Sequence, residues 1–370
     1  KKKNTAKIFC VNGDYLADIS AVGILDAMMG ETYDYDIYPV INAQNLVIAD
    51  LPTFVSENEE EMQKCYSQSA QAVYQEIVWP SLTSIASRTG AKMTCMMTPQ
   101  FTYTDEEEPD GENVTYYLKR LKEEHAEAGL SADSMEGIPL SEKIKQDQTF
   151  WQTYAPSYRF LSLYADGVKS IGEKSALPAE IRTVALGSGA SGQAVGYLNE
   201  NVTLQPSTSS GIRHTFLDDF KVKCMETALG YSNITLDLYS VTYPEGDEDS
   251  WEKMSKKIAA NLGTYWKAYE AFDATTLTES DVRIRRFLAL DYKQQRAGNV
   301  ITLSLEHRED AAWFLLRLHG EKVTEVAGGS FEEIEDGVYL ILAEEDEVSV
   351  EVQTGETWQY QDGGKRGDGT

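Results

Sequence analysis

The chain has 370 residues, of which 42% are hydrophobic, so it can bury one large core and a smaller one. Its formal net charge of −27 argues against nucleic acids and anionic lipid surfaces as partners and favours neutral or cationic ligands. The sequence alone shows neither an apolar run long enough to span a membrane nor a signal peptide. Because it begins KKKNTAKIFC, without Met, we expect a piece of a longer polypeptide, with any membrane contact made through an upstream segment.

Strand-like runs alternate with helical stretches through roughly the first 290 residues. Residues 56–90 have the 3.6-residue apolar spacing of a long helix, with Ser56 as N-cap and Gly90 as its stop. Such alternation is typical of a parallel sheet, and no GxGxxG follows the first strand. The pattern therefore predicts an α/β fold, a (β/α) barrel of about seven strands over residues 1–292. The expected strands include residues 6–11, 91–98, 158–165, 181–187, 201–207 and 233–240.

The pattern changes after residue 299. Residues 300–358 contain β-type runs with period-two alternation, separated by turn signals such as Glu335-Asp336-Gly337, and predict a small antiparallel β-sandwich domain. Residues 359–370 predict a flexible tail. The four cysteines form no CxxC pair or zinc-ribbon spacing. We therefore predict no cofactor from the cysteines, while a divalent metal elsewhere stays open.

Candidate site residues follow from the rule that ligands of such a barrel lie at the C-terminal ends of its strands. Asp14 comes just after the first expected strand, although an Asp in that place can equally cap a helix. Asp14, Glu127 and Asp237 are the carboxylates for which we expect a catalytic role, since glycosidases use two of them roughly 5 to 10 Å apart. The expected substrate-binding residues are Tyr15, Gln100, Gln205, His214, Tyr239 and Tyr243. Their aromatic rings would stack on pyranose faces.

NGDY after the first expected strand and AEAGLSADS further on resemble the first two motifs of NodB-type polysaccharide deacetylases. In that family an aspartate and two histidines hold a divalent ion that activates water against an N-acetyl carbonyl. Asp14 matches one aspartate position, but the neighbouring position holds Gly13. Ser131 stands at the first histidine position, and Ser134 or Met135 near the second. Since hydroxyl and thioether groups are poor substitutes for imidazole, the resemblance implies a deacetylase-type barrel without the usual metal centre.

The wider chain resembles a family of uncharacterised bacterial proteins, similar to ones found near genes for a Pel-like, amino-sugar-rich exopolysaccharide. The resemblance implies a polysaccharide deacetylase-like protein of exopolysaccharide or cell-surface polysaccharide metabolism, acting as a carbohydrate-binding or atypical hydrolase module. Two alternatives stay open: a carboxylate-pair glycoside hydrolase, and a non-catalytic component of a polysaccharide-export assembly. Whether the chain is an enzyme is therefore uncertain. The expected partners are an amino-sugar polysaccharide and, for the last alternative, export proteins, in an extracytoplasmic or cell-envelope location.

Overall fold

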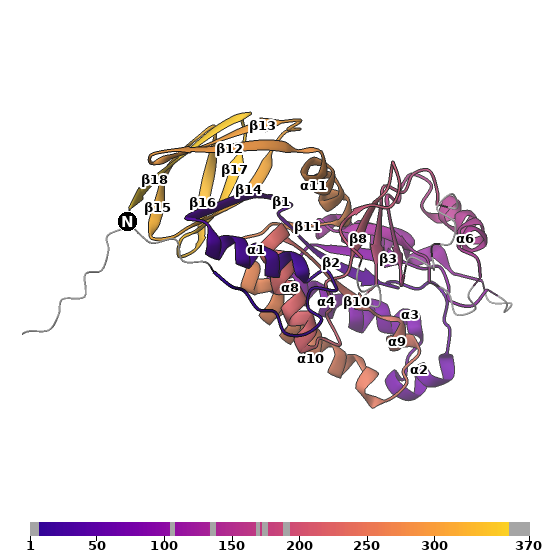
Figure 1. Ribbon diagram of the computed structural model, residues 1–370. Coiled ribbons are helices and arrows are strands. Elements are labelled where there is room, and N and C mark those ends of the chain that lie inside the picture. The colour runs from indigo at the N-terminus through magenta and orange to yellow at the C-terminus, as the bar shows by residue number, and fades with distance from the viewer. Residues whose placement is uncertain are drawn as a thin grey trace, which may run out of the picture. The chain divides into compact units, whose positions relative to one another are not determined.

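The computed structural model describes residues 7–103, 108–133, 138–167, 171, 177–187 and 193–354 (Figure 1). The chain divides into two compact units, one made of Lys1–Met28 and Val40–Leu288 and the other of Met29–Pro39 and Ala289–Thr370. This division differs from the expected one, because a short segment near the N-terminus joins the C-terminal unit. No helix among the described residues is both long enough and apolar enough to span a membrane.

The first unit is built on a curled ten-stranded sheet whose longer strands all run parallel. Its strand order is β7-β8-β6-β5-β4-β3-β2-β10-β9, with β11 also paired to β2. The longer strands are β2 (Ala43–Ala49), β3 (Met93–Met97), β4 (Glu127–Ser131), β5 (Ser162–Ala165), β6 (Thr183–Leu186), β8 (Thr203–Pro206) and β10 (Tyr231–Asp237). The short ones are β7 (Gly196–Tyr197), β9 (Ser209–Ser210) and β11 (Ala274–Thr275). The predicted α/β fold with a barrel-like parallel sheet is confirmed at this level.

The barrel is not closed by a continuous ladder, because β8 and β10 are not paired as strands. The chain between β8 and β9 bridges this gap. Ser207 N donates to Leu186 O of β6 at 2.9 Å, whereas Thr208 N donates to Asn233 O of β10 at 2.8 Å. The two edges of the sheet thus meet through a bend in one segment. The prediction of a closed or nearly closed and possibly irregular barrel is confirmed only in part, because the sheet curls like a barrel without closing.

The first strand of this sheet is β2 and not the predicted strand at residues 6–11. The described residues 7–12 form no strand, and Cys10 is exposed. By contrast, every residue of β2, with the sequence AQNLVIA, is buried. A fully buried run is what a parallel strand covered on both faces requires. The prediction for residues 6–11 is therefore wrong, and Asp50 rather than Asp14 follows the first strand of the sheet.

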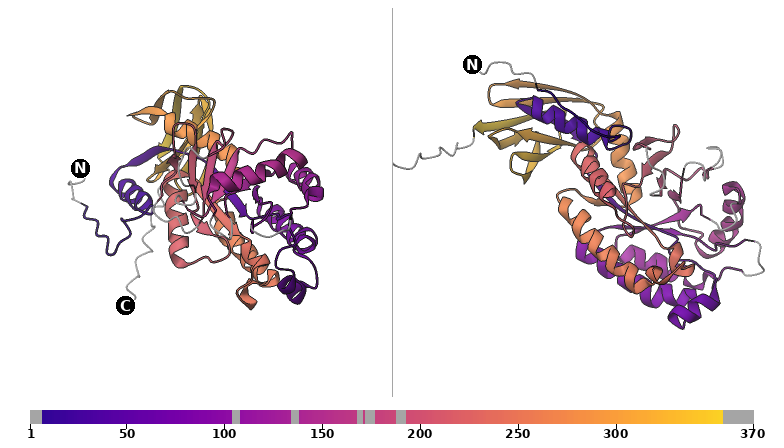
Figure 2. Two further views of the ribbon diagram at one scale, coloured as in Figure 1. Left: turned by 90° about the vertical axis from the view of Figure 1, so that its right-hand side faces the viewer. Right: turned by 60° about the horizontal axis from the view of Figure 1, so that its bottom comes forward.

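Helices cover the sheet, and α4 and α10 lie side by side although far apart in sequence (Figures 1 and 2). The long helix predicted for residues 56–90 is divided into α2, α3, a π-helical turn over Tyr74–Val78 and α4, and Ser67 in the left-handed region ends α2. The helices of this unit are α2 (Glu59–Tyr66), α3 (Ala70–Val73), α4 (Trp79–Thr89), α5 (Val114–Glu123), α6 (Leu140–Tyr154), α8 (Phe216–Leu229), α9 (Tyr239–Thr242), α10 (Trp251–Asn261) and α11 (Leu277–Ala289). A further helix, α1 (Ala21–Thr32), spans the division between the two units.

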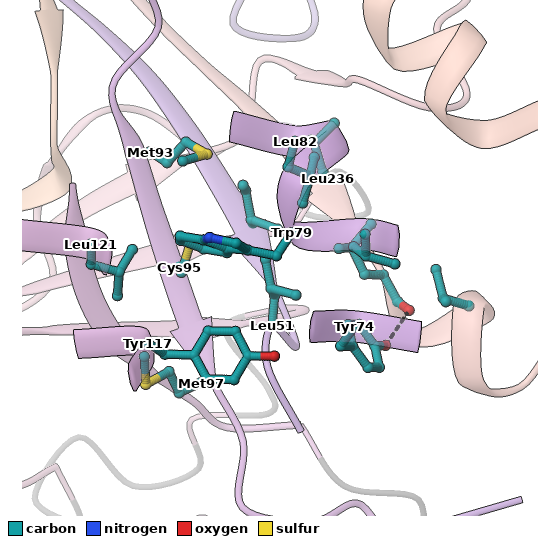
Figure 3. Packing of buried hydrophobic residues seen from close by; sticks show 14 of the residues in the cluster. Leu51, Tyr74, Trp79, Leu82, Met93, Cys95, Met97, Tyr117, Leu121 and Leu236 are labelled. Atoms are coloured by element: carbon teal, nitrogen blue, oxygen red, sulfur yellow. Dashed lines mark hydrogen bonds between the residues drawn. The ribbon is translucent and has the colours of Figure 1, made fainter. Parts of the chain in front are cut away.

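The main core of the first unit packs between the sheet and these helices. Figure 3 shows Trp79 and Tyr117 beside the side chains of Cys95 and Met97 from β3. The Trp79 and Tyr117 rings meet edge to face, with centroids 5.7 Å apart. Such close packing of large rings makes this side of the sheet rigid, so the strand ends that carry polar residues are held in place.

The second unit is an antiparallel β-sandwich, as its period-two alternation predicts. Its sheets have the orders β1-β14-β17-β16 and β12-β13-β18-β15. Phe314, Ile341 and Val350 belong to one buried cluster that draws on both sheets. The strands are β1 (Tyr35–Val40), β12 (Asp291–Ala297), β13 (Val300–Glu306), β14 (Ala312–Leu318), β15 (Glu321–Ala327), β16 (Gly329–Glu335), β17 (Val338–Ala343) and β18 (Glu347–Thr354). Only β1 comes from before the parallel sheet in sequence, which explains the changed domain boundary.

Candidate active site

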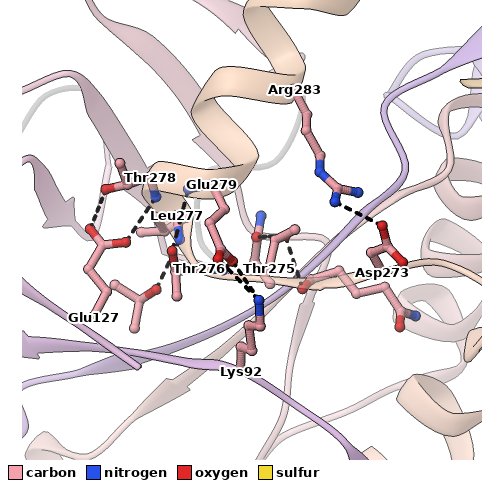
Figure 4. A network of polar contacts seen from close by, with 12 residues as sticks. Lys92, Glu127, Asp273, Thr275, Thr276, Leu277, Thr278, Glu279 and Arg283 are labelled. Carbon is pink, nitrogen blue, oxygen red and sulfur yellow. Dashed lines mark hydrogen bonds and ion pairs between the residues drawn. The ribbon is translucent and has the colours of Figure 1, made fainter. Parts of the chain in front are cut away.

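The N-terminal ends of the parallel strands are occupied by the start of α11 (Figure 4). Thr278 donates to both oxygens of Glu127, from its backbone N at 2.9 Å and from Oγ1 at 2.7 Å. Leu277 N donates to Thr94 Oγ1 at 3.0 Å. Glu127 is the first residue of β4 and so lies at the opposite end of the sheet from Asp237. The expectation that these two carboxylates lie together at the strand ends is therefore wrong.

Replacing Glu127 by Ala should lower the free energy of unfolding by about 1–3 kcal/mol, because Thr278 N–H and its hydroxyl lose their acceptor. Activity per folded molecule should not change. Urea denaturation measures the first effect, and Glu123→Ala on the exposed part of α5 is the control. A variant of normal stability without activity would contradict this structural role.

Gln205 lies inside the curled sheet and is fully buried, with 0% exposure. Its Nε2 donates to Thr183 Oγ1 at 2.8 Å and to Leu277 O at 2.9 Å. Its Oε1 accepts from Asn45 Nδ2 at 3.0 Å. Since its amide is committed to this internal network, Gln205 does not present a group to a ligand at the strand ends. The substrate-binding role predicted for it thus has no support in its position.

Four aspartates gather at the C-terminal ends of the parallel strands, and we call them the carboxylate edge. Asp50 follows β2, Asp133 lies two residues after β4, Asp166 follows β5, and Asp237 ends β10. All four charges act on the phenol of the buried Tyr164, whose pKa is raised by burial first and by these carboxylates next. The four side chains therefore surround a common region, as the strand-end rule for parallel sheets leads one to expect.

Gly187, which follows β6, faces this region without a side chain. A Cβ there would lie 2.7 Å from Tyr164 Oη and 2.8 Å from Asp166 Oδ1. Both distances are shorter than real Cβ contacts, so any larger residue would displace one of these two groups. The glycine thus leaves the ends of the Tyr164 and Asp166 side chains in place.

Asp50 is the most enclosed member of the carboxylate edge, with 1% exposure. Burial raises the pKa of its carboxyl well above the usual value, and repulsion by Asp133 and Asp237 raises it further. Its Oδ1 accepts a hydrogen bond from Ser131 Oγ at 2.7 Å. Ser131, which occupies the place of a metal-binding histidine in the sequence resemblance, thus serves here as a hydroxyl donor to a carboxylate.

The pKa of Asp133 is raised into the neutral range. Burial is the largest cause that raises it, to about 7, followed by repulsion from Asp237 and Asp166. A hydrogen bond from the backbone of Asp166 and the positive charge of Lys143 act in the opposite direction. A carboxyl group that is close to half protonated at neutral pH can both give and take a proton, which ordinary aspartates cannot do efficiently.

Lys143 and Asp147, one turn apart on α6, form a buried ion pair beside the carboxylate edge. Lys143 is fully buried, and its Nζ lies 2.6 Å from Asp147 Oδ2. Tyr103 Oη donates to the other oxygen of Asp147, also at 2.6 Å. Because Asp147 holds the ammonium in place, its charge acts at a fixed position on Asp50 and Asp133.

Aromatic rings lie near the carboxylate edge. Tyr239 and Tyr243 stack with centroids 4.9 Å apart, and Phe101 meets both edge-on. Tyr243 Oη donates to Glu57 Oε2 at 3.2 Å. The charges of Asp50 and Asp237 raise the pKa of Tyr239 after burial does, so this stack lies close to them. The two half-buried tyrosines, both expected from the sequence to bind substrate, thus lie beside Asp237, for which the sequence predicted a catalytic role.

Three other residues predicted from the sequence, Asp14, Tyr15 and His214, are not among the side chains that form the carboxylate edge. Asp14 is exposed on the N-terminal segment, where Tyr15 packs against Phe220 at a centroid distance of 5.3 Å. His214 Nδ1 lies 2.7 Å from Ser209 Oγ, and the ring stacks on Tyr265. Burial lowers the pKa of His214, which favours the neutral ring.

Gln100 follows β3, and its Oε1 is buried without a hydrogen-bond partner within the described residues. Of the residues that the sequence prediction missed, Asp50 could have been found by applying the same strand-end rule to the apolar run AQNLVIA. Asp133 stood within the quoted motif AEAGLSADS. Ser134 and Met135 lie outside the described residues.

The side chains at the carboxylate edge do not fit the metal centre of the deacetylases that the sequence resembles, which needs two histidines. His125 lies just before β4, at its N-terminal end, and therefore at the opposite end of this strand from Asp133. Throughout the ranges that the structure describes, no three His, Cys, Asp or Glu side chains are placed to hold a metal ion. The absence of a metal stays a prediction, and no chemical step below depends on one.

The chain matches no protein-family model and no curated protein. Its fold is similar to that of a proposed polysaccharide deacetylase from Mycobacterium smegmatis, with 7% identity and a TM-score of 0.41 over 66% of this chain and 90% of that one. It is also similar to a proposed glycoside hydrolase/deacetylase from Parabacteroides distasonis, with 10% identity and a TM-score of 0.38 over 75% and 82%.

A third similar structure is the α-fucosidase of Thermotoga maritima, with 8% identity and a TM-score of 0.32 over 84% of this chain and 95% of that one. Identities this low concern the fold alone. TM-scores below 0.5 are too low to support a conclusion about activity.

Proposed function

We propose that the chain is a polysaccharide-processing hydrolase whose carboxylate edge cleaves glycosidic bonds of an amino-sugar polymer. The observation that carries this proposal is the gathering of four aspartates at the C-terminal ends of the parallel strands, where burial and the neighbouring charges raise the pKa of Asp133 to about 7. Two carboxyl groups in different protonation states are the chemical requirement of glycosidases. This favours the carboxylate-pair hydrolase over the metal-dependent deacetylase and the passive binding module.

Asp133 is the proton donor in this proposal. It passes its proton to the glycosidic oxygen as the bond from that oxygen to the anomeric carbon breaks. Asp237, which remains accessible to solvent, removes a proton from the attacking water, whose oxygen forms the new bond to the anomeric carbon. Asp50 is buried and accepts a hydrogen bond from Ser131, so in this proposal it is a positioning residue at the floor of the site and takes no part in proton transfer.

The expected substrate is a neutral or cationic sugar polymer. The stacked rings of Tyr239 and Tyr243 offer faces to pyranose rings. The four aspartates and the net charge of −27 repel anionic polymers such as uronic-acid chains. Partly deacetylated polyhexosamines, which carry ammonium groups, satisfy both conditions.

The test is to incubate the purified chain with fully and partly N-acetylated polyhexosamines and to measure reducing ends and free acetate separately. New reducing ends without acetate are the expected result. Acetate without reducing ends would mean deacetylation instead, and polymer binding without either product would leave a binding module. A stoichiometric metal ion in elemental analysis of the active protein would contradict the metal-free mechanism.

A further inference from the structure

A cavity of about 710 Å³ lies in the first unit between α6, the end of β4, and the segments 155–160 and 178–181. None of its lining residues belongs to the proposed proton-transfer pair Asp133 and Asp237. It does include Ser131, whose hydroxyl donates to Asp50, and Asp147, which pairs with Lys143. The cavity therefore adjoins the carboxylate edge and offers room beside it.

One wall of the cavity is a face of α6. Ile144, Gln148 and Gln152 follow one another at four-residue spacing, so their side chains lie in one row along the helix. The two glutamines are exposed to solvent. An amide group both donates and accepts hydrogen bonds, which suits hydroxyl and acetamido groups of a sugar.

The lining also includes aromatic rings from α6 and from the segment that follows it. Phe160 has ring centroids 4.8 Å from both Trp151 and Tyr158. Tyr158 is fixed in place because its Oη accepts from Ala128 N at 2.9 Å. A mixed lining of fixed aromatic rings and flexible amides is typical of pockets for small polar ligands with an apolar face, and pyranose rings have this character.

The charge of the cavity differs from that of the carboxylate edge. Arg159 and Glu180 contribute opposite charges, and Asp147 is neutralised by Lys143. No excess of carboxylates thus faces this space among its lining residues, and there is no reason for it to prefer a cation.

We infer that this cavity binds neutral pyranose rings, those that keep their N-acetyl groups, of a chain whose neighbouring units reach the carboxylate edge. The identity of the polymer rests on the proposed function, but the binding of a neutral sugar to this cavity does not. The two regions differ in their linings, because amides and aromatic rings line the cavity whereas ionisable carboxyl groups lie at the strand ends. We therefore assign sugar binding to the cavity and bond cleavage to the strand ends.

The test uses isothermal titration of the N-acetylglucosamine tetramer and of its fully deacetylated counterpart. The wild type is compared with Gln148→Leu, Gln152→Leu and the control Gln146→Leu, an exposed glutamine of the same helix outside the cavity lining. The two cavity variants should bind the neutral tetramer about tenfold more weakly, as expected for a lost hydrogen bond or two. Gln146→Leu should bind like the wild type, and circular dichroism checks that all variants fold.

Equal binding of the neutral tetramer by all four proteins, or no binding by the wild type, would overturn the inference, as would a clear preference of the cavity for the deacetylated tetramer. Hydrolysis is measured in parallel. If no polymer is cleaved while the two cavity variants still lose affinity, the proposed function fails and the cavity remains a sugar site. If the polymer is cleaved but the two cavity variants bind the tetramer as the wild type does, the proposed function stands and the cavity is not a sugar site.

Discussion

Replacing Asp133 by Asn should lower the rate of polyhexosamine cleavage by about 10²–10⁴-fold, the usual contribution of a general acid. The amide has nearly the same shape as the carboxylic acid but cannot pass a proton to the leaving oxygen. Asp14→Asn is the matched control, because Asp14 is exposed on the N-terminal segment, where its neighbour Tyr15 packs against Phe220 of α8. Reducing-end release measures both. An inactive Asp14→Asn with an active Asp133→Asn would reverse the assignment made here.

The same variant has a signature in pH. Asp133 holds its proton below a pH of about 7 and loses it above that value, because burial and the neighbouring aspartates disfavour its charged form. The wild-type rate should therefore fall as the pH rises through about 7. The residual rate of Asp133→Asn should lack this decline. A wild-type rate that rises through the same range would contradict Asp133 as the acid and fit a general base instead.

Replacing Glu226 by Gln should stabilise the protein at alkaline pH. Glu226 on α8 is fully buried against Gln44 of β2, whose Nε2 donates to Glu226 Oε1 at 3.1 Å. Burial raises its pKa from 4.5 to about 7, so the folded state retains the proton longer than the unfolded chain. The stability contributed by this group is complete below pH 4.5 and is lost as the pH rises through about 7. A glutamine has no charge to bury and escapes this loss.

The expected gain is roughly 3 kcal/mol in the free energy of unfolding above pH 8, and close to nothing at pH 4.5. Urea denaturation of both proteins at a series of pH values measures it. Glu60→Gln, at an exposed position of α2, controls for the removal of one negative charge from an acidic chain. A pH-independent difference between Glu226→Gln and the wild type would show that Glu226 is not the titrating group.

The two proposals together describe how a polymer would be handled. The carboxylate edge carries the repelling charges that keep a proton on Asp133. The neighbouring cavity is lined by amides and aromatic rings, and in the second proposal it binds a neutral sugar. A polymer with both acetylated and free amino groups would meet a suitable surface for each kind of unit. Ser131 lies where the two surfaces meet, because it lines the cavity and its hydroxyl donates to Asp50.

Local patterns in the sequence were sufficient to predict the fold class of each part of the chain. Alternation of strands and helices indicated the parallel sheet, and period-two runs indicated the sandwich, because side-chain periodicity depends only on local backbone geometry. Asp237 and the tyrosines 239 and 243 could be placed near a strand end for the same reason. The sequence also showed a serine, Ser131, at the position where the resemblance would place a histidine.

Only the tertiary structure shows which strands are neighbours and which residues lie together at the same end of the sheet. Glu127 and Ser131 are four residues apart, yet they lie at opposite ends of β4, because a strand rises by about 3.3 Å per residue. Asp50 and Asp133 are distant in sequence and come together only through the strand order of the sheet. The raised pKa of Asp133 likewise depends on burial and on neighbours from other strands. Neither is encoded in a local pattern, so Asp133 could not be proposed as the proton donor before the fold was known.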